Sequence, residues 1–177
     1  MDRPPVIDGT LTDDGWQNAR VIADLPLQKG GTATQRTAIR LCYDNQAIYV
    51  AYDCAEDRMP ELLASVTQTG GPLWRDDAVE VFVVPWHKKA AQFVTNPIAS
   101  RYVGGADESW QVAVQKGASG WTAEFAIPFV CLGEVAPAKG DIWGINFGRE
   151  EKPHGEVTAW SAPGYHDRDS DGDLVFE

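Results

Sequence analysis

A single acidic residue interrupts an apolar segment that is otherwise typical of a buried β-strand. In the segment 73–85, LWRDDAVEVFVVP, Glu80 is the one charged residue between Ala78 and Val84. Alternate residues of a strand share a face, so Glu80 lies on the face opposite the valines. A buried carboxylate is costly unless it is paired. We therefore expect the valines to face the core and Glu80 to face a ligand or an internal partner.

Amide side chains and glycines share one face in two other segments. In QFVTNP, Gln92 and Asn96 lie on the same side, and in WGINFGR, Asn146 lies between Gly144 and Gly148. Amides both donate and accept hydrogen bonds, which suits the hydroxyl groups of a neutral ligand. Glycine in a strand marks close approach of a ligand or of another chain segment. Two alternatives stay open: Asn96 caps the end of its strand, and aromatic side chains cover the glycines.

The chain is rich in aromatic residues, with seven tryptophans and five tyrosines. A buried tryptophan needs a partner for its indole N–H, so we expect some of the seven to lie at a binding surface. Trp74 directly precedes the strand of Glu80, and Trp160 lies beside a loop. One such tryptophan alone is more often part of a core. Together with the neutral amides, the pair predicts a site where two indole rings enclose a flat sugar ring.

The segment 166–173, HDRDSDGD, contains the pattern D-x-D-x-D-G. Three carboxylates around a glycine turn, here Asp167, Asp169 and Asp171, are typical of calcium-binding loops, since Ca²⁺ prefers oxygen ligands. The pattern is incomplete, because the bidentate glutamate of the full loop would fall beyond Glu177. A solvated acidic turn is the alternative interpretation.

Signatures of catalysis are scarce. The sequence has no G-x-S-x-G motif and no histidine pair at zinc spacing. Glu80 and Glu124 could in principle form a glycosidase pair, but Glu124 is expected to point outward between two core positions. We therefore predict no catalytic residues and a binding function. The three cysteines have no metal-binding spacing, and the sequence leaves open whether two of them are bridged.

The length and the charge restrict the class of protein. A chain of 177 residues fits one domain, 1–177, and a net charge of −11 argues against nucleic acid or an anionic membrane as a partner. Many short strands, hairpin turns near 44–46 and 116–120, and at most a short helix at 58–65 predict the fold. We expect an all-β, single-domain antiparallel β-sandwich, immunoglobulin-like or jelly-roll-like, with little helix.

The order of these motifs resembles carbohydrate-binding module family 9 over essentially the whole chain. The matching segments are IDG with Trp16, WRDDAVEVF at 74–82, QFxxNP at 92–97, GWTxExxIPF at 120–129 and WxINF at 143–147. The resemblance implies a non-catalytic β-sandwich that binds glucan or xylan, including reducing ends, between two tryptophans. It also implies a module within a larger, extracellular or cell-surface protein, joined to a catalytic domain such as a glycoside hydrolase.

The resemblance also implies roles for particular residues. Trp74 and Trp160 would be the two clamps, Glu80 the carboxylate that binds sugar hydroxyls, and Asn96 and Asn146 the strand amides of the site. Well-known members have an arginine two residues before the position of Asn96, where this chain has a valine. This departure leaves the sugar preference open, with Arg101 or Arg149 as substitutes. Structural calcium ions are a further family feature.

Two other functions stay open from the sequence. The related DOMON domains bind haem through methionine and histidine for electron transfer, and this chain has Met59 and three histidines. A glycan-active enzyme using Glu80 and Glu124 is the third hypothesis. A visible spectrum would test the first of these alternatives, and the separation of the two carboxyl groups would test the second.

Overall fold

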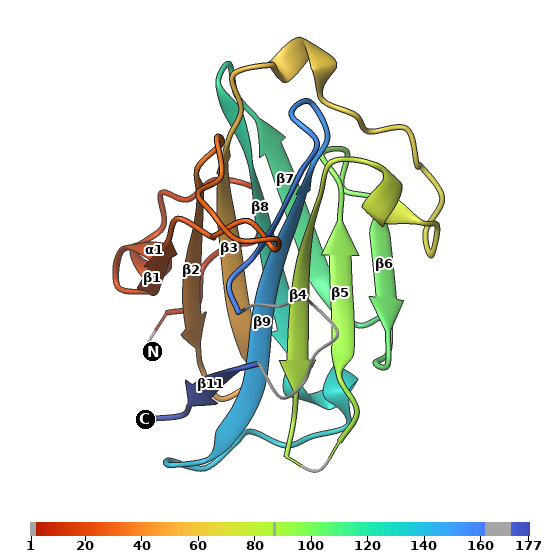
Figure 1. Cartoon of the computed structure of the whole chain (residues 1–177). Coiled ribbons are helices and arrows are strands. Elements are labelled where there is room, and N and C mark those ends of the chain that lie inside the picture. The colour runs from red at the N-terminus through yellow and green to blue at the C-terminus, as the bar shows by residue number, and fades with distance from the viewer. Residues whose placement is uncertain (1–2, 87, 162–170) are drawn as a thin grey trace.

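Two antiparallel sheets packed face to face form the molecule (Figure 1). The computed structural model describes residues 3–86, 88–161 and 171–177. One sheet has the order β1-β2-β3-β8-β7. Its strands are β1 (Arg20–Ala23), β2 (Thr37–Tyr43), β3 (Ala47–Ala55), β8 (Gly120–Pro128) and β7 (Gln111–Lys116). The predicted class, an antiparallel β-sandwich with little helix, is confirmed.

The second sheet has the order β10-β9-β4-β5-β6, with β11 also paired to β9. Its strands are β10 (Glu156–Ala159), β9 (Ile142–Glu151), β4 (Ala78–Val84), β5 (Ala91–Thr95), β6 (Arg101–Gly104) and β11 (Gly172–Val175). Helical structure is limited to α1 (Asp14–Gln17) and the 3₁₀ turns η1 (Met59–Glu61), η2 (Leu73–Arg75) and η3 (Phe129–Leu132). The helix expected at 58–65 is therefore one 3₁₀ turn.

The core lies between the two sheets and follows the predicted alternation. Val79, Val81 and Val83 are fully buried in it, together with Tyr52 and Phe125 of the facing sheet. Burial of large apolar side chains from both sheets supplies most of the stability of such a sandwich. Consequently the alternate residues of β4, including Glu80, lie on the outward face of their sheet.

A second, smaller cluster covers the outward face of the five-stranded sheet. Trp16 of α1 is fully buried there against Tyr49 and Ala51. Its indole Nε1–H donates to Glu124 Oε1 at 2.6 Å, and the backbone N–H of Asp8 donates to Glu124 Oε2 at 2.8 Å. Glu124 thus anchors the N-terminal segment to the sheet. This role explains why an acidic residue occupies an outward-facing position between two core residues of β8.

All three cysteines, Cys42, Cys54 and Cys131, are free thiols. No helix in the part of the chain that the structure describes is long and apolar enough to cross a membrane.

Candidate functional site

The outward face of the six-stranded sheet holds the predicted carboxylate. The register pairs Glu80 with Gly148 on one side and with Val94 on the other, and Val94 in turn pairs with Tyr102. These residues therefore form a row across the sheet on its outward face. The glycine and the valine leave Glu80 flanked by little side-chain bulk. The side chain is nevertheless only 2% exposed.

Glu80 has one hydrogen-bond donor among the described side chains, Gln92, whose Nε2 lies 2.7 Å from Oε2. Burial raises the pKa of Glu80 to about 7, against the lowering effect of the Gln92 hydrogen bond; nearby Glu150 raises it further and Lys152 lowers it. A carboxylate has room for several hydrogen bonds. Gln92 and Glu80, which the sequence places on separate strands, are thus brought together at the centre of this face.

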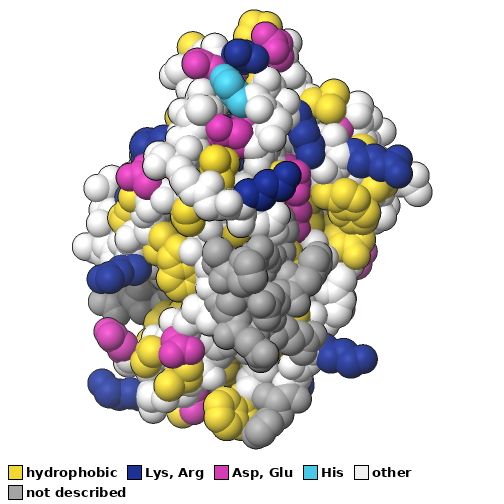
Figure 2. Space-filling model, in the orientation of Figure 1, with side chains coloured by type: hydrophobic (Ala, Val, Ile, Leu, Met, Phe, Trp, Pro, Cys, Tyr) yellow, Lys and Arg dark blue, Asp and Glu magenta, His cyan; other side chains and the backbone are white. Residues whose placement is uncertain are grey.

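Trp74 lies on the same side of the molecule, at the end of the sheet where β4 begins. Its side chain is 44% exposed, and its ring stands edge-on to Tyr102, with centroids 5.5 Å apart and planes at 89°. Figure 2 shows hydrophobic side chains gathered over η2 and β6, with Lys and Arg side chains beside them. An exposed indole held by an aromatic neighbour offers a flat apolar face to a ligand.

Trp74 is held in place by the loops around it. Leu73, the residue before it, is fully buried, and Lys152 Nζ donates to the Trp74 carbonyl at 2.8 Å and contacts Glu150 Oε2 at 2.9 Å. Lys152 therefore links η2 to the end of β9, near Glu80. Tyr102, Glu150 and Lys152 were not predicted as site residues. Alternation along β9 could have indicated Glu150 and Lys152, since both share the outward face with Asn146.

Asn96 is fully buried and serves the surrounding loops. Its Nδ2 donates to the Val66 carbonyl and to Asp76 Oδ2, both at 2.9 Å, and its Oδ1 accepts from the N–H groups of Ile98 and Ser100. All four hydrogen-bonding positions of the amide are thus occupied by protein. The structure favours the capping alternative for Asn96, which shapes the loop behind Trp74.

Asn146 lies on the outward face but is also occupied. Its Oδ1 accepts from the N–H of Ser161 at 3.0 Å and of Phe147 at 2.9 Å, and its Nδ2 donates to the Ser161 carbonyl at 3.2 Å. It therefore fastens the segment after β10 onto β9. Among the described residues, partners therefore fill all four hydrogen-bonding positions of Asn96 and three of the four of Asn146.

Trp160 has a different environment from Trp74. Its ring packs against the core residue Phe147, with centroids 5.7 Å apart. It also fills the space that a Cβ on Gly172 would take, at 2.1 Å from such an atom. Gly172 pairs with Ile145, a core residue, so Trp160 lies on the inward side of the sheet at its edge, whereas Trp74 lies at the outward face. The described structure does not bring the two rings together as a clamp.

Neither of the arginines suggested as substitutes reaches Glu80. Arg101 lies over the Trp110 ring, 4.6 Å from its centroid, and donates to the Glu108 carbonyl. Arg149 is buried on the inward face and contacts Glu56 at 3.4 Å. Among the described cations, Lys152 is the one whose positive charge acts on Glu80, where it lowers the pKa of the carboxyl group.

The glycosidase hypothesis requires Glu80 and Glu124 to flank one bond. They lie on the outward faces of opposite sheets, and packed sheets are about 10 Å apart, so the carboxyl groups are separated by the whole sandwich. Glycosidase pairs are about 5–9.5 Å apart. This geometry does not support the catalytic alternative.

A cluster of carboxylates at one end of the sandwich could hold a metal ion. Glu56, Asp77 and Glu151 are buried and offer oxygen atoms within 4.8 Å of one another. Burial raises the pKa of both Glu56 and Asp77. Arg149 partly compensates their charge, and His154 contacts Glu151 at 3.0 Å. Of the predicted calcium ligands, Asp167 and Asp169 lie outside the described residues, and Asp171 lies beside Gly144.

The protein is thus a two-sheet antiparallel β-sandwich with an exposed aromatic side chain, Trp74, at one of its sheets. A family model, the carbohydrate family 9 binding domain-like model, matches residues 7–168, and the chain belongs to this family. No curated protein sequence matches the chain.

Solved structures similar to this chain show the same fold. A family 9 module from Caldicellulosiruptor kristjanssonii in complex with cellotriose has a TM-score of 0.75 and 18% identity, covering 99% of this chain and 90% of that one. The glucose complex has a TM-score of 0.76 and 18% identity, covering 99% and 92%. A Bacteroides uniformis protein, suggested to bind carbohydrate, has a TM-score of 0.74 and 16% identity, covering 91% and 88%.

Proposed function

We propose that this chain is a non-catalytic carbohydrate-binding module that recognises neutral glucan or xylan chains at the Trp74 surface, defined here as Trp74, Tyr102, Glu80, Gln92 and Lys152. The observation that carries this proposal is an exposed indole on the same side of the sheet as a buried carboxylate that has one hydrogen-bond donor among the described side chains. A sugar ring presents an apolar face and a polar edge, and this surface offers a partner for each. Ligands of the similar modules, cellotriose and glucose, agree with this chemistry.

In this proposal one sugar ring stacks on Trp74 while its hydroxyl groups reach Glu80 and Gln92. Ionised Glu80 accepts hydrogen bonds from hydroxyls, and the amide of Gln92 fixes the carboxylate on its other side. Lys152 supplies the positive charge that an arginine supplies in well-known members. Because Trp160 lies elsewhere, the second face of the sugar is not enclosed by that residue, and chain-end recognition needs a separate test.

Titration calorimetry with cello- and xylo-oligosaccharides, before and after reduction of their ends, tests the proposal. Trp74→Ala should weaken binding by about 10- to 100-fold, the effect of removing a central aromatic contact. Trp86→Ala is the matched control, because Trp86 is 68% exposed but follows β4 at its other end. Equal affinity of the wild type and Trp74→Ala would refute the proposed surface. Weaker binding of reduced oligosaccharides would indicate that the reducing end is recognised.

We also propose that calcium, which the family resemblance implies, is held by Glu56, Asp77 and Glu151. Three carboxylates against one arginine form a hard-oxygen donor set with excess negative charge, which suits Ca²⁺. The ion would supply charge compensation and tie β3 to β4 and β9. Attachment to a catalytic domain of a larger extracellular protein is a proposal that rests on the family resemblance.

The haem alternative receives no support from the groove between β1, β2, β9 and β11. The described residues that line this groove include neither methionine nor histidine. Those are the residues expected to bind haem iron. His154 is instead engaged with Glu151 and Asp57.

A further inference from the structure

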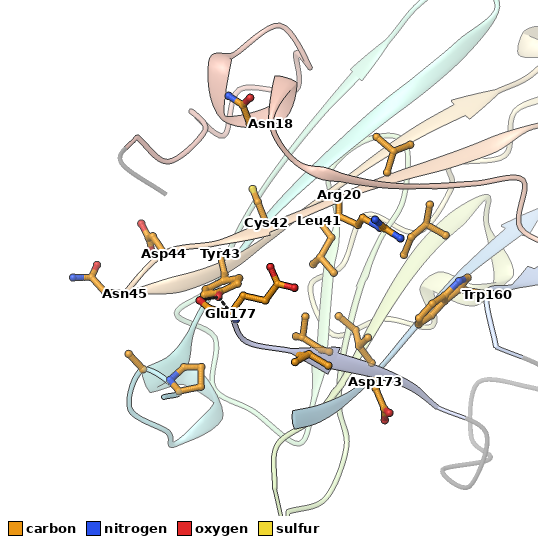
Figure 3. Close-up of a pocket in the computed structure, with 17 residues that line it drawn as sticks. Asn18, Arg20, Leu41, Cys42, Tyr43, Asp44, Asn45, Trp160, Asp173 and Glu177 are labelled. Carbon is orange, nitrogen blue, oxygen red and sulfur yellow. Dashed lines mark hydrogen bonds between the residues drawn. The ribbon is translucent and has the colours of Figure 1, made fainter. Parts of the chain in front are cut away.

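The two sheets meet at one side of the sandwich, where the edge strand β1 faces β10 and β11. This side is closed beside β10 (the upper half) and open beside β11 (the lower half). In the upper half, the segment after β1 lies along β10: Gln28 N–H donates to the Val157 carbonyl at 2.8 Å, and Ala159 N–H donates to the Pro26 carbonyl at 3.1 Å. In the lower half, no strand pairing among the described residues joins β1 to β11, and the hydroxyl of Tyr43 bridges the far end through its hydrogen bonds with the backbone of Glu177. The groove between these two edge strands has a volume of about 1260 Å³ (Figure 3).

The floor of this groove is apolar, because side chains of the core reach it. Ile22 faces inward, since it pairs with the core residue Ile39. Leu41 of β2 and Leu174 of β11 also line the groove and pack against the core. An apolar floor of this kind is suited to the C–H face of a ligand rather than to a fully hydrated one.

Trp160 forms one end of the groove. It lines the groove and is only partly exposed, because its ring is wedged between Phe147 and the backbone of Gly172. Its orientation is therefore fixed by the core before any ligand arrives. A rigid aromatic ring binds with little loss of conformational entropy, which favours affinity. Trp160 is thus a preorganised platform that the Trp74 surface does not use.

Arg20 brings hydrogen-bond donors to the mouth of the groove. It pairs with Leu41, so its side chain projects inward, and within the described residues no hydrogen bond or ion pair engages its guanidinium group. Figure 3 shows Arg20 and Glu177 extending into the space beside Leu41. The lining also includes two further acids, Asp173 and Asp44, of which Asp44 is hydrogen-bonded within its own hairpin. Acids therefore outnumber Arg20 in the groove, which disfavours an anionic ligand and is compatible with an uncharged ligand whose hydroxyl groups bind Arg20.

We propose that this groove is a second and separate binding site for an uncharged oligosaccharide chain, with a ring stacked on Trp160 and hydroxyls bound to Arg20. The choice of a glycan as ligand rests on the proposed function, but no residue is shared with the Trp74 surface. The groove exceeds the range of about 300–1,000 Å³ that is typical of sites for one small molecule. The groove therefore accommodates more than one sugar unit. The module would bind a polysaccharide at two sites, the Trp74 surface and this groove.

Calorimetry and NMR titration of the whole chain with cellohexaose and xylohexaose test this proposal. The wild type should show two binding events, and Trp74→Ala should retain one of them. In the Trp74→Ala background, Ile22→Trp fills the groove and should abolish the remaining event. Ala23→Trp is the matched control, since Ala23 is the exposed, outward-facing neighbour on the same strand, and it should leave that event intact. Thermal melts check that each variant is folded.

Arg20→Ala is a second, milder variant at an exposed position. It should weaken the groove event by about 2- to 13-fold for each hydrogen bond lost. A single event that Trp74→Ala abolishes would overturn the second site while leaving the proposed function intact. A residual event that neither Ile22→Trp nor Arg20→Ala changes would also overturn it. Binding that ignores Trp74→Ala but disappears in Ile22→Trp would place the glycan in the groove and refute the Trp74 surface.

Discussion

The stability of the protein should depend on pH through Glu80. Its side chain is almost fully buried, and burial raises its pKa from 4.5 to about 7. This difference corresponds to about 3 kcal/mol between the neutral and the ionised side chain in the folded protein. The substitution Glu80→Gln keeps an acceptor for the Gln92 amide but removes the titration. It therefore isolates the cost of burying the charge.

The direction of the effect follows from the raised pKa. Below pH 4.5 the side chain is neutral in both states, and the wild type has no penalty. As the pH rises toward 7, the unfolded chain ionises while the folded protein keeps its proton, so the wild type loses stability. Above pH 7 the full penalty applies. The free energy of unfolding of Glu80→Gln, relative to wild type, should thus increase by about 3 kcal/mol between pH 4 and pH 8.

Urea unfolding followed by tryptophan fluorescence across this pH range measures the difference. Glu108→Gln, at an exposed position, is the control for the loss of one negative charge. A difference for Glu80→Gln that does not change with pH would show that Glu80 is not a buried titrating acid. A difference that decreases with pH would mean that the ionised form is stabilised by partners that the structure does not contain.

Three further predictions concern the surroundings of this site. Asn96→Ala should lower the free energy of unfolding by about 3 kcal/mol in urea titrations, because the four hydrogen bonds of this buried side chain are lost; a change below about 0.5 kcal/mol would contradict its loop-shaping role. Calcium at about 100 times its dissociation constant should raise the melting temperature by about 5–10 °C in wild type but not in Glu151→Gln, and an equal rise in both would exclude this cluster. Cellotriose should bind about fivefold more tightly at pH 8 than at pH 5.5, because ionised Glu80 accepts stronger hydrogen bonds from hydroxyls; calorimetry showing tighter binding at pH 5.5 would contradict that role.

The strands with long apolar runs could be predicted from the sequence, and an exposed strand was missed. The segments that form β2, β3 and β4 are rich in apolar residues, and β3 and β4 are buried over most of their length. Strand β1 is short and almost wholly exposed, so its composition contains little signal. The region 58–65 was expected to be helical, but only Met59–Glu61 forms a 3₁₀ turn, and the following residues bind the carboxylates of Asp76 and Asp77 instead.

For the site, alternation along each strand predicted which side chains share a face. It did not predict which of these side chains are already hydrogen-bonded to other parts of the protein. Gln92 and Glu80 were each expected to be ligand-binding residues on separate strands, and the structure shows them hydrogen-bonded to each other. Asn96 and Asn146 were also expected to bind a ligand, but their amides are hydrogen-bonded to loops of the protein. The paths of these loops depend on tertiary packing. The position of Trp160 was not predictable either, because it follows from Gly172, twelve residues later, leaving space for the ring. Long-range packing of this kind has no local sequence signal.

The chemical shift of the Trp74 indole N–H during titration with cellotriose tests the central claim most directly. The claim predicts that this signal and the side-chain amide of Gln92 shift saturably, with one common dissociation constant, while the indole signal of Trp86 stays in place. Saturable shifts that leave both Trp74 and Gln92 unchanged would contradict the assignment of this surface as the glycan-binding site.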